Sequence, residues 1–203
     1  EEFVAQRLAE FLRNSHPLTV AERERVQGII ERSGLSETQA RAVWVALENG
    51  VAILTGRPGS GKTTTTRTFV ECCDALGWTV AIAAPTGKAA ARAAEVTKRP
   101  ASTVHRLIGG ASGMVREQPL PYRVIVLDET SMADLETVAW LLKNVDPRQT
   151  SILFVGDKDQ LPSVGHGRVF ADLIESQAIP TVELRDIFRQ GVNSRIVLNA
   201  HRL

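Results

Sequence analysis

A glycine-rich stretch that ends in a lysine and a threonine carries the clearest chemical signal in these 203 residues. Positions 56–63 read GRPGSGKT and match G-x-x-x-x-G-K-[ST] at every fixed position. Such glycines let successive backbone N–H groups turn onto one anion. Lys62 would then reach the β- and γ-phosphates, and the Thr63 hydroxyl would bind Mg²⁺. A nucleoside triphosphate is the predicted ligand, held by Gly56, Pro58, Gly59, Ser60, Gly61, Lys62, Thr63 and Thr64.

Polar side chains also follow two apolar runs later in the chain. Asp128 and Glu129 come directly after 124–127. Adjacent carboxylates repel each other without a cation, so Mg²⁺ gives their pairing a reason. Asp128 would hold the metal through its water shell, and Glu129 would orient and deprotonate the attacking water. Gln160 follows the run 151–155 and could report whether the γ-phosphate is present. A plain surface turn is the alternative at each position, and the glycine loop favours the catalytic interpretation.

The elements that must position these groups alternate along the chain. Strands are expected at 51–55, 79–84, 124–127, 151–155 and 181–184, and helices at 64–76, 86–95, 135–142 and 169–176. This alternation predicts an α/β fold, a parallel sheet with helices on both faces. Ligands of such sheets gather at the carboxyl ends of the strands, where the candidate residues fall.

Three other segments of the chain contain no candidate catalytic residues from sequence alone. Two helical patterns at 1–14 and 19–32 predict a small N-terminal helical segment, 1–34, ahead of an ATP-binding domain at 35–203. The glycine- and proline-rich stretch 107–122 is either a surface loop or a small insertion such as a β-hairpin. Because the chain starts at Glu1 and stops inside a helical pattern at 194–203, we expect it to be a fragment.

Composition sets broad limits on the class of protein. A hydrophobic fraction of 43% and a charged fraction of 23% are ordinary for a globular domain. No run is long enough to span a membrane and no signal peptide opens the chain. Cys72 and Cys73 are neighbours in a predicted helix, which supports neither a disulfide framework nor a zinc site and makes a cytoplasmic setting the default. The net charge of +1 neither indicates nor excludes a nucleic-acid partner.

The sequence resembles the RecD-like group of superfamily 1 DNA helicases from about Leu35 to Leu203. The matching strings, in family order, are Leu35–Gln39, GRPGSGKT (56–63), APTGKAA (84–90), STVHRLIG (102–109), VLDETSM (126–132), VGDKDQLPSVGHG (155–167) and LRDIFRQ (184–190). The resemblance implies a RecA-like P-loop NTPase fold and an ATP- and Mg²⁺-dependent motor. Such a motor translocates 5′ to 3′ on single-stranded DNA and hydrolyses ATP faster when DNA is bound. The family's catalytic positions are Lys62, Asp128, Glu129, Gln160 and Arg189 here.

Three further assignments come with the resemblance. Gln39 would contact adenine, whereas the sequence alone equally allows a capping box with Ser36. Gln160 and Arg189 would contact the γ-phosphate, although Arg189 by itself reads as a surface helix residue. The DNA contacts would be Pro85, Thr86, Gly87, Lys88, Thr103 and His105. Their hydroxyl and N–H groups suit phosphates, and a basic stripe formed by Arg92, Lys98, Arg99 and Arg106 lies nearby. The alternatives are a solvated helix face for this stripe and a helix-packing role for His105.

The resemblance also implies parts that this chain lacks. A second motor domain, with an arginine that completes the ATP site, would follow Leu203, so the isolated chain should hydrolyse ATP poorly or not at all. Residues 107–122 occupy the position of the family's strand-separating pin but contain no tryptophan or phenylalanine to act as a wedge. We expect a monomeric motor that binds other repair or recombination proteins and does not bind a membrane. The alternatives are a P-loop ATPase that remodels protein and a nucleotide-binding module without turnover.

Overall fold

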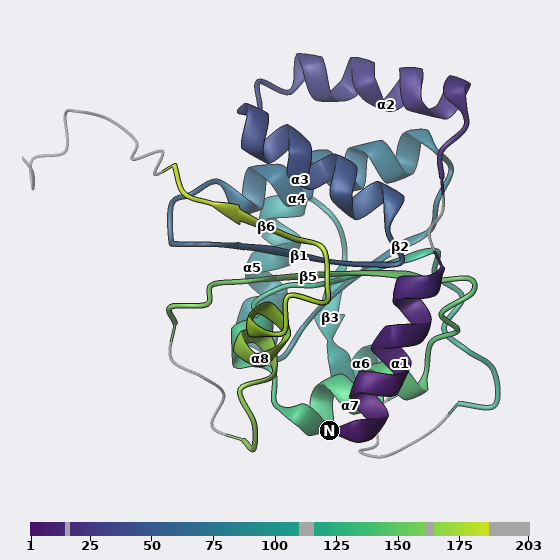
Figure 1. Cartoon of the computed structure of the whole chain (residues 1–203), viewed down its shortest axis with the longest axis vertical. Helices are drawn as coiled ribbons and strands as arrows, with labels where there is room; N and C mark the ends of the chain where they lie inside the picture. Colours follow the sequence, from purple (N-terminus) through teal and green to yellow (C-terminus); the bar gives the residue numbers. More distant parts are fainter. Residues whose placement is uncertain (15–16, 110–115, 161–164, 187–203) are drawn as a thin grey trace, which may run out of the picture.

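A computed structural model describes residues 1–14, 17–109, 116–160 and 165–186, in which a parallel sheet lies between two layers of helices (Figure 1). The strands are β1 (Val51–Gly56), β2 (Val80–Ala84), β3 (Ala101–Thr103), β4 (Val124–Leu127), β5 (Ser151–Gly156) and β6 (Thr181–Leu184). The helices are α1 (Glu2–Arg13), α2 (Val20–Arg32), α3 (Glu37–Glu48), α4 (Lys62–Ala75), α5 (Gly87–Thr97), α6 (Val104–Ile108), α7 (Leu135–Lys143) and α8 (Val169–Glu175), with a 3₁₀ turn, η1 (Thr130–Met132). The predicted α/β class is confirmed.

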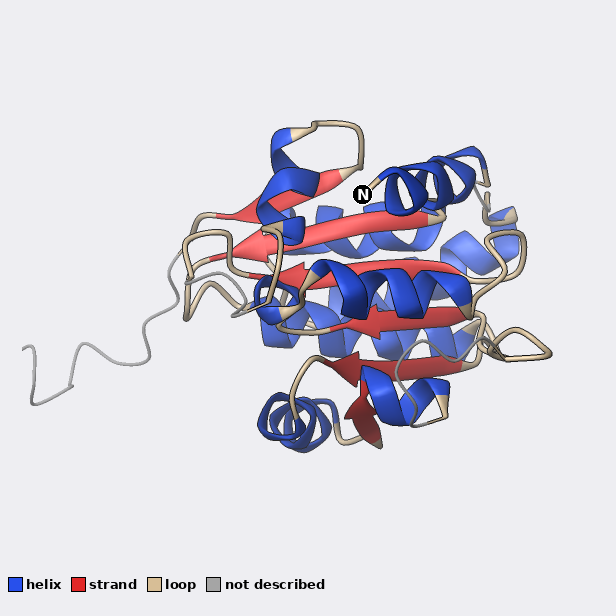
Figure 2. Cartoon of the chain, turned by 90° about the horizontal axis from the view of Figure 1, so that it is seen from below, coloured by secondary structure: helices blue, strands red, loops and turns tan. Residues whose placement is uncertain are grey.

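Strand order decides which loops can meet. The sheet runs β3-β2-β4-β5-β1-β6, and every pairing is parallel (Figure 2). β5 therefore lies between β1 and β4, with Leu54 opposite Val155 and Leu127 opposite Phe154. Because all carboxyl ends share one edge, the loops that follow β1, β4 and β5 are brought together there.

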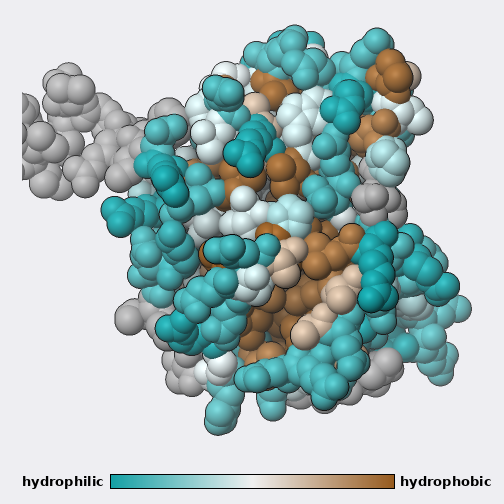
Figure 3. All heavy atoms as spheres, viewed as in Figure 1, coloured by the Kyte–Doolittle hydropathy of each residue, from teal (hydrophilic) through white to brown (hydrophobic). Residues whose placement is uncertain are grey.

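Alternating side chains along the strands fill two separate cores. Val51 and Ile53 point to a core shared with α1, α6, α7 and α8, whereas Ala52 and Leu54 point to a core shared with α2, α3, α4 and α5. Burial of a side chain such as Ile53 stabilises the fold by roughly 1.5–3 kcal/mol. Viewed as in Figure 1, hydrophobic atoms are visible in a hollow between α8 and α1 (Figure 3).

The two N-terminal helices pack on opposite faces of the sheet. Val4, Leu8 and Phe11 recur at helical spacing on α1 and join the core that contains α7. Val26 and Ile30 of α2 join the other core, with α3 and α4. Both helices thus contribute to the cores of the sheet, and a domain boundary at residue 34 stays a prediction.

The sequence missed β3 and α6. β3 has only three residues and pairs with β2 at the sheet edge, so it offers no alternating pattern to recognise. In the described part of the 107–122 stretch, α6 ends before Gly109 (φ 107°), and 116–122 forms neither helix nor strand. Residues 110–115 and 194–203 lie outside the described residues, so the hairpin and the last helix stay predictions. None of the helices among the described residues combines the length and hydropathy needed to cross a bilayer.

Candidate nucleotide-binding site

The glycine loop forms the predicted turn between β1 and α4. Gly61 caps α4 with φ 90°, a left-handed conformation that side chains rarely adopt. At Gly56 the constraint is space, because an added Cβ would lie 2.6 Å from Ser60 Oγ and 2.7 Å from the Leu184 carbonyl oxygen. Helix α4 starts at Lys62, so its first N–H groups and the positive end of its dipole face the loop.

A cavity of about 480 Å³ opens above this loop. It is lined by Pro58, Gly59, Gly61, Lys62, Thr63, Thr64, Thr66, Arg92, Ala93, Val96, Thr97, Asp128, Glu129 and Gln160. The loops that follow β1, β4 and β5 all contribute, as the strand order requires. Groups separated by almost a hundred residues in sequence, Lys62 to Gln160, thus share one cavity.

The lysine of the glycine loop lies within the cradle. Its amine donates to the carbonyl oxygens of Gly56 and Arg57, the second at 3.2 Å. Burial lowers the pKa of Lys62, while the carboxylates of Asp157, Glu129 and Asp128 act in the opposite direction. These charges identify the acidic groups that lie within electrostatic reach of the amine.

The two adjacent carboxylates differ in environment. Burial raises the pKa of Asp128, whose Oδ1 accepts a hydrogen bond from the Glu129 N–H at 2.9 Å. Glu129 has φ 51°, an uncommon conformation for a residue with a side chain and one that is found at functional sites. Its Oε1 lies 3.9 Å from Arg92 Nη1.

The loop after β5 is fixed to the strand that carries the glycine loop. The Lys158 N–H donates to Thr55 Oγ1 at 3.4 Å, and the buried Asp157 accepts from the Asp159 N–H at 3.0 Å. Gln160 ends this turn and lines the cavity. Three buried hydroxyls around the site, those of Ser60, Thr66 and Ser131, lack a hydrogen-bond partner, which is uncommon for buried polar atoms.

Gly56 and Ser60 belong to the glycine loop without lining the cavity, and two further predicted residues, Gln39 and Arg189, do not line it either. Gln39 is buried in the first turn of α3, where its Oε1 accepts from the Ser36 N–H at 2.9 Å and Ser36 Oγ accepts in return. The capping box is therefore present, and contact with adenine stays a prediction. Arg189 lies outside the described residues.

The predicted DNA contacts lie along the neighbouring part of the same edge. Ala84 at the end of β2 is paired with Thr103 at the end of β3, so the loops after these strands are adjacent. Thr86 accepts from the Ala89 N–H and Thr103 from the Arg106 N–H, both at 3.2 Å, as N-caps of α5 and α6. Both threonines and Pro85 are half-buried, and Gly87 and Lys88 are exposed.

His105 has a neighbour of its own. Its ring lies edge-on to Trp140, with centroids 5.0 Å apart and planes at 71°. This contact supports the helix-packing alternative for His105, and its role in DNA binding stays a prediction.

Arg92 is the residue whose place the sequence did not indicate. In sequence it groups with Lys98, Arg99 and Arg106 as a basic stripe near the predicted DNA contacts, yet its side chain lines the nucleotide cavity beside Glu129. The reason is strand order: β2, which leads into α5, is paired with β4, which leads into Glu129. No pattern within the sequence of α5 reports that pairing.

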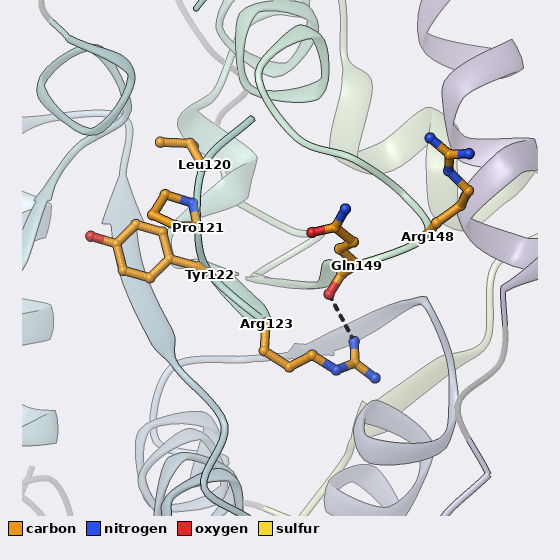
Figure 4. A pocket seen from close by; sticks show the side chains of 6 residues that line it. All are labelled: Leu120, Pro121, Tyr122, Arg123, Arg148 and Gln149. Atoms are coloured by element: carbon orange, nitrogen blue, oxygen red, sulfur yellow. Dashed lines mark hydrogen bonds between the residues drawn. The ribbon is translucent and has the colours of Figure 1, made fainter. Parts of the chain in front are cut away.

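A second, shallow cavity of about 540 Å³ lies near the opposite edge of the sheet (Figure 4). It is lined by Leu120, Pro121, Tyr122, Arg123, Arg148 and Gln149. Arg123 donates to the Gln149 carbonyl oxygen at 3.3 Å and stacks over Trp78, and Arg148 pairs with Asp146. These cations already have structural contacts, and the amino ends of parallel strands are not where ligands gather, so this cavity is a poorer candidate.

Comparison with known proteins agrees with the site. A family model described as an AAA domain matches residues 34–203. The ATP-dependent RecD2 DNA helicase of Deinococcus radiodurans is 43% identical over 175 residues, which cover 85% of this chain and 24% of that protein. The chain belongs to the AAA-domain family, in its RecD-like helicase group. The nucleotide-binding character of the cavity follows from this membership and from the glycine loop.

Other relatives of this RecD-like domain extend the likeness. The RecBCD enzyme subunit RecD of Mycobacterium tuberculosis is 42% identical over 170 residues, 70% of this chain and 29% of that subunit. The crystal structure of Pif1 helicase from Candida albicans superposes with a TM-score of 0.57 and 26% identity over 83% of this chain and 43% of that one. The chain thus spans about a quarter of the length of the curated relatives named here.

Proposed function

We propose that this chain is the ATP-binding motor domain of a DNA helicase that moves along single-stranded DNA. The observation that carries the proposal is the meeting of Lys62, Asp128, Glu129 and Gln160 in one cavity at the carboxyl edge of the sheet. A triphosphate-binding loop, a pair of carboxylates and a polar sensor are what hydrolysis coupled to motion requires. The relative from Deinococcus radiodurans is itself named as a DNA helicase, which supports DNA as the substrate.

Each side chain of the cavity has a role in this proposal. The N–H groups at the start of α4 and the amine of Lys62 hold the phosphates of ATP, while Glu129 orients the attacking water and accepts its proton. Gln160 senses the terminal phosphate, and Arg189, by family resemblance, adds a second contact to it. The preference for adenine belongs to Gln39.

Magnesium fits the donors that the cavity offers. Asp128 and Thr63 present hard oxygen atoms beside the phosphate cradle, and Mg²⁺ is usually held by one or two carboxylates together with substrate phosphates. Among the described residues, no group of three or more His, Cys, Asp or Glu side chains could hold a metal ion. Bound there, Mg²⁺ would neutralise charge that develops on the phosphates.

In this proposal DNA binds along the rim formed by the loops after β2 and β3. Thr86 and Thr103 each use their hydroxyl oxygen as an acceptor for a helix N–H, which leaves the hydroxyl hydrogen free to donate to a phosphate. Lys88 adds charge on an exposed position. Such contacts recognise the backbone and not the bases, so we expect weak sequence preference. The polarity, 5′ to 3′, and repair or recombination proteins as partners rest on the family resemblance, whereas a cytoplasmic setting rests on the cysteine usage.

The test is steady-state ATP turnover by the full-length natural chain, measured with and without single-stranded DNA. We expect DNA to stimulate turnover, and Lys62→Ala to abolish both turnover and unwinding because the phosphates lose their side-chain cation. Lys88→Ala, the matched lysine variant on the rim, should retain DNA-free turnover. An ATPase that ignores DNA at every concentration would favour a protein-remodelling role. Unwinding that survives Lys62→Ala would make nucleotide binding merely structural.

A further inference from the structure

The side chain of Arg92 reaches the nucleotide cavity from α5, a helix whose first turn belongs to the proposed DNA rim. Its guanidinium lines the cavity together with Lys62, Asp128 and Glu129. The nearest carboxylate oxygen is Glu129 Oε1, at 3.9 Å from Nη1, and the Arg92 side chain is 74% exposed. A cation in this place is not explained by the motifs that identify the phosphate cradle.

The pairing with Glu129 is loose enough to be exchanged. A distance of 3.9 Å is at the long end for an ion pair, and Arg92 faces solvent within the cavity. Pairs of this kind change an equilibrium constant by no more than about fivefold. A group that carries more negative charge than one carboxylate, placed in the same cavity, would therefore compete effectively for the guanidinium.

The side of the cavity on which Arg92 lies identifies the group it can reach. The glycine loop and Lys62 hold the β-phosphate side of the nucleotide, whereas the water oriented by Glu129 approaches the γ-phosphorus from the side opposite the β-phosphate. A side chain next to Glu129 is therefore adjacent to the γ-phosphate and remote from the α- and β-phosphates. A guanidinium offers a planar fork of donors that suits the oxygens of a terminal phosphate.

We propose that Arg92 is a γ-phosphate-binding residue, which exchanges Glu129 for the terminal phosphate when a triphosphate occupies the site. The exchange also frees the Glu129 carboxylate to orient the attacking water. This inference rests on the proposed ATP site and adds to it a cation supplied by the same domain, positioned by the pairing of β2 with β4.

Equilibrium binding without DNA and without turnover tests the exchange. The full-length natural chain is titrated, in the presence of Mg²⁺, with a non-hydrolysable ATP analogue and separately with ADP. Because a hydrogen bond to a charged group is lost, Arg92→Gln should weaken binding of the analogue about tenfold and leave ADP binding within about twofold. Arg92→Lys should give an intermediate value, since it keeps the charge and loses the fork.

Two controls keep the result specific. Arg67→Gln removes an exposed arginine that pairs with Glu71 on α4, and it should change neither affinity. Glu129→Gln removes the competing partner of Arg92, so binding of the analogue should be retained or tightened by up to about fivefold. An unchanged melting temperature for Arg92→Gln, expected at so exposed a position, ensures that the variant is folded.

Three outcomes overturn the inference. Equal losses for ADP and for the analogue would mean that Arg92 supports the cavity in general, and no loss for either would leave it a surface residue. If only Glu129→Gln lost affinity for the analogue, Glu129 and not Arg92 would be the residue that supports binding of the γ-phosphate. The titrations contain no DNA, so they test this inference alone. The proposed function would be refuted separately, by a protein that binds the triphosphate but whose turnover DNA does not stimulate.

Discussion

The phosphate cradle and the proposed DNA rim lie on one edge of the same sheet but are built differently. In the cradle, polar groups are left without internal partners or in uncommon conformations: the Ser60 and Thr66 hydroxyls are buried and unpaired, and Glu129 has φ 51°. On the rim, Thr86 and Thr103 cap helices. The cradle shows features that folding alone does not require, whereas each rim threonine already has a role in folding.

The difference shows how far geometry can support each part of the proposal. Buried polar atoms without partners and left-handed residues cost free energy, so their clustering indicates a ligand that compensates them. A helix cap stabilises the fold whether or not DNA binds. The rim therefore depends on family resemblance for its function, and experiments on the two regions should separate their free energies of folding from those of binding.

Apart from the loss of turnover expected for Lys62→Ala, the largest effect is expected in the cradle, at Glu129. Glu129→Gln keeps the size of the side chain and removes the base, so turnover in the presence of single-stranded DNA should fall by about 10²–10⁴-fold. ATP binding, measured by titration, should persist because the phosphates are held by the glycine loop and Lys62. Glu136→Gln, an exposed carboxylate in the first turn of α7, is the matched control and should retain full turnover.

Loss of ATP binding in Glu129→Gln would change the comparison. It would mean that the carboxylate maintains the left-handed turn after β4 instead of acting on water. The unusual conformation of Glu129 would then have a role in folding, as the threonines of the rim do.

A smaller effect is expected on the rim. Thr86→Ala and Thr103→Ala should each lower the free energy of unfolding by about 1 kcal/mol through loss of an N-cap. Affinity for single-stranded DNA should also fall several-fold, because a phosphate contact is lost. Serine at either position keeps the hydroxyl and should restore both quantities. Fluorescence anisotropy with labelled DNA and chemical denaturation measure the two effects separately.

Thr19→Ala provides a control for the capping component. Thr19 caps α2 with a capping box, so its loss should cost similar stability and leave DNA affinity unchanged. If the rim variants lose only stability, as Thr19→Ala does, the threonines are caps and the DNA path lies elsewhere.

The sequence predicts local chemistry well because that chemistry is contiguous. The segment from Val51 to Thr63 contains strand, glycine turn and helix start in one stretch, and the convergence of Asp128 and Gln160 on it follows from parallel strands ending at one edge. The apolar runs of β1, β2, β4, β5 and β6 were visible for the same reason. The capping box at Ser36 is equally local and is present in the structure.

What the sequence does not predict depends on non-local pairing. The three residues of β3 are recognisable as a strand only by their pairing with β2. The positions of α1 and α2 on opposite faces depend on how the chain crosses the sheet, although both read as amphipathic helices. The place of Arg92 in the cavity requires the pairing of β2 with β4, which spacing within α5 cannot report.

The smallest effect is expected at Gln39. Substitutions of this one side chain can separate its role in folding from its proposed role in binding. Its Oε1 is used by the Ser36 N–H, so Gln39→Ala should cost about 0.5–1 kcal/mol of unfolding free energy. Gln39→Glu keeps this acceptor and should retain stability, but it removes the amide donor that an adenine edge would need. Competition between ATP and GTP, measured as relative affinity, should then show reduced preference for ATP in both variants. A preference that is unchanged in Gln39→Glu while Gln39→Ala loses only stability would make the side chain a cap, leaving base selection to other residues.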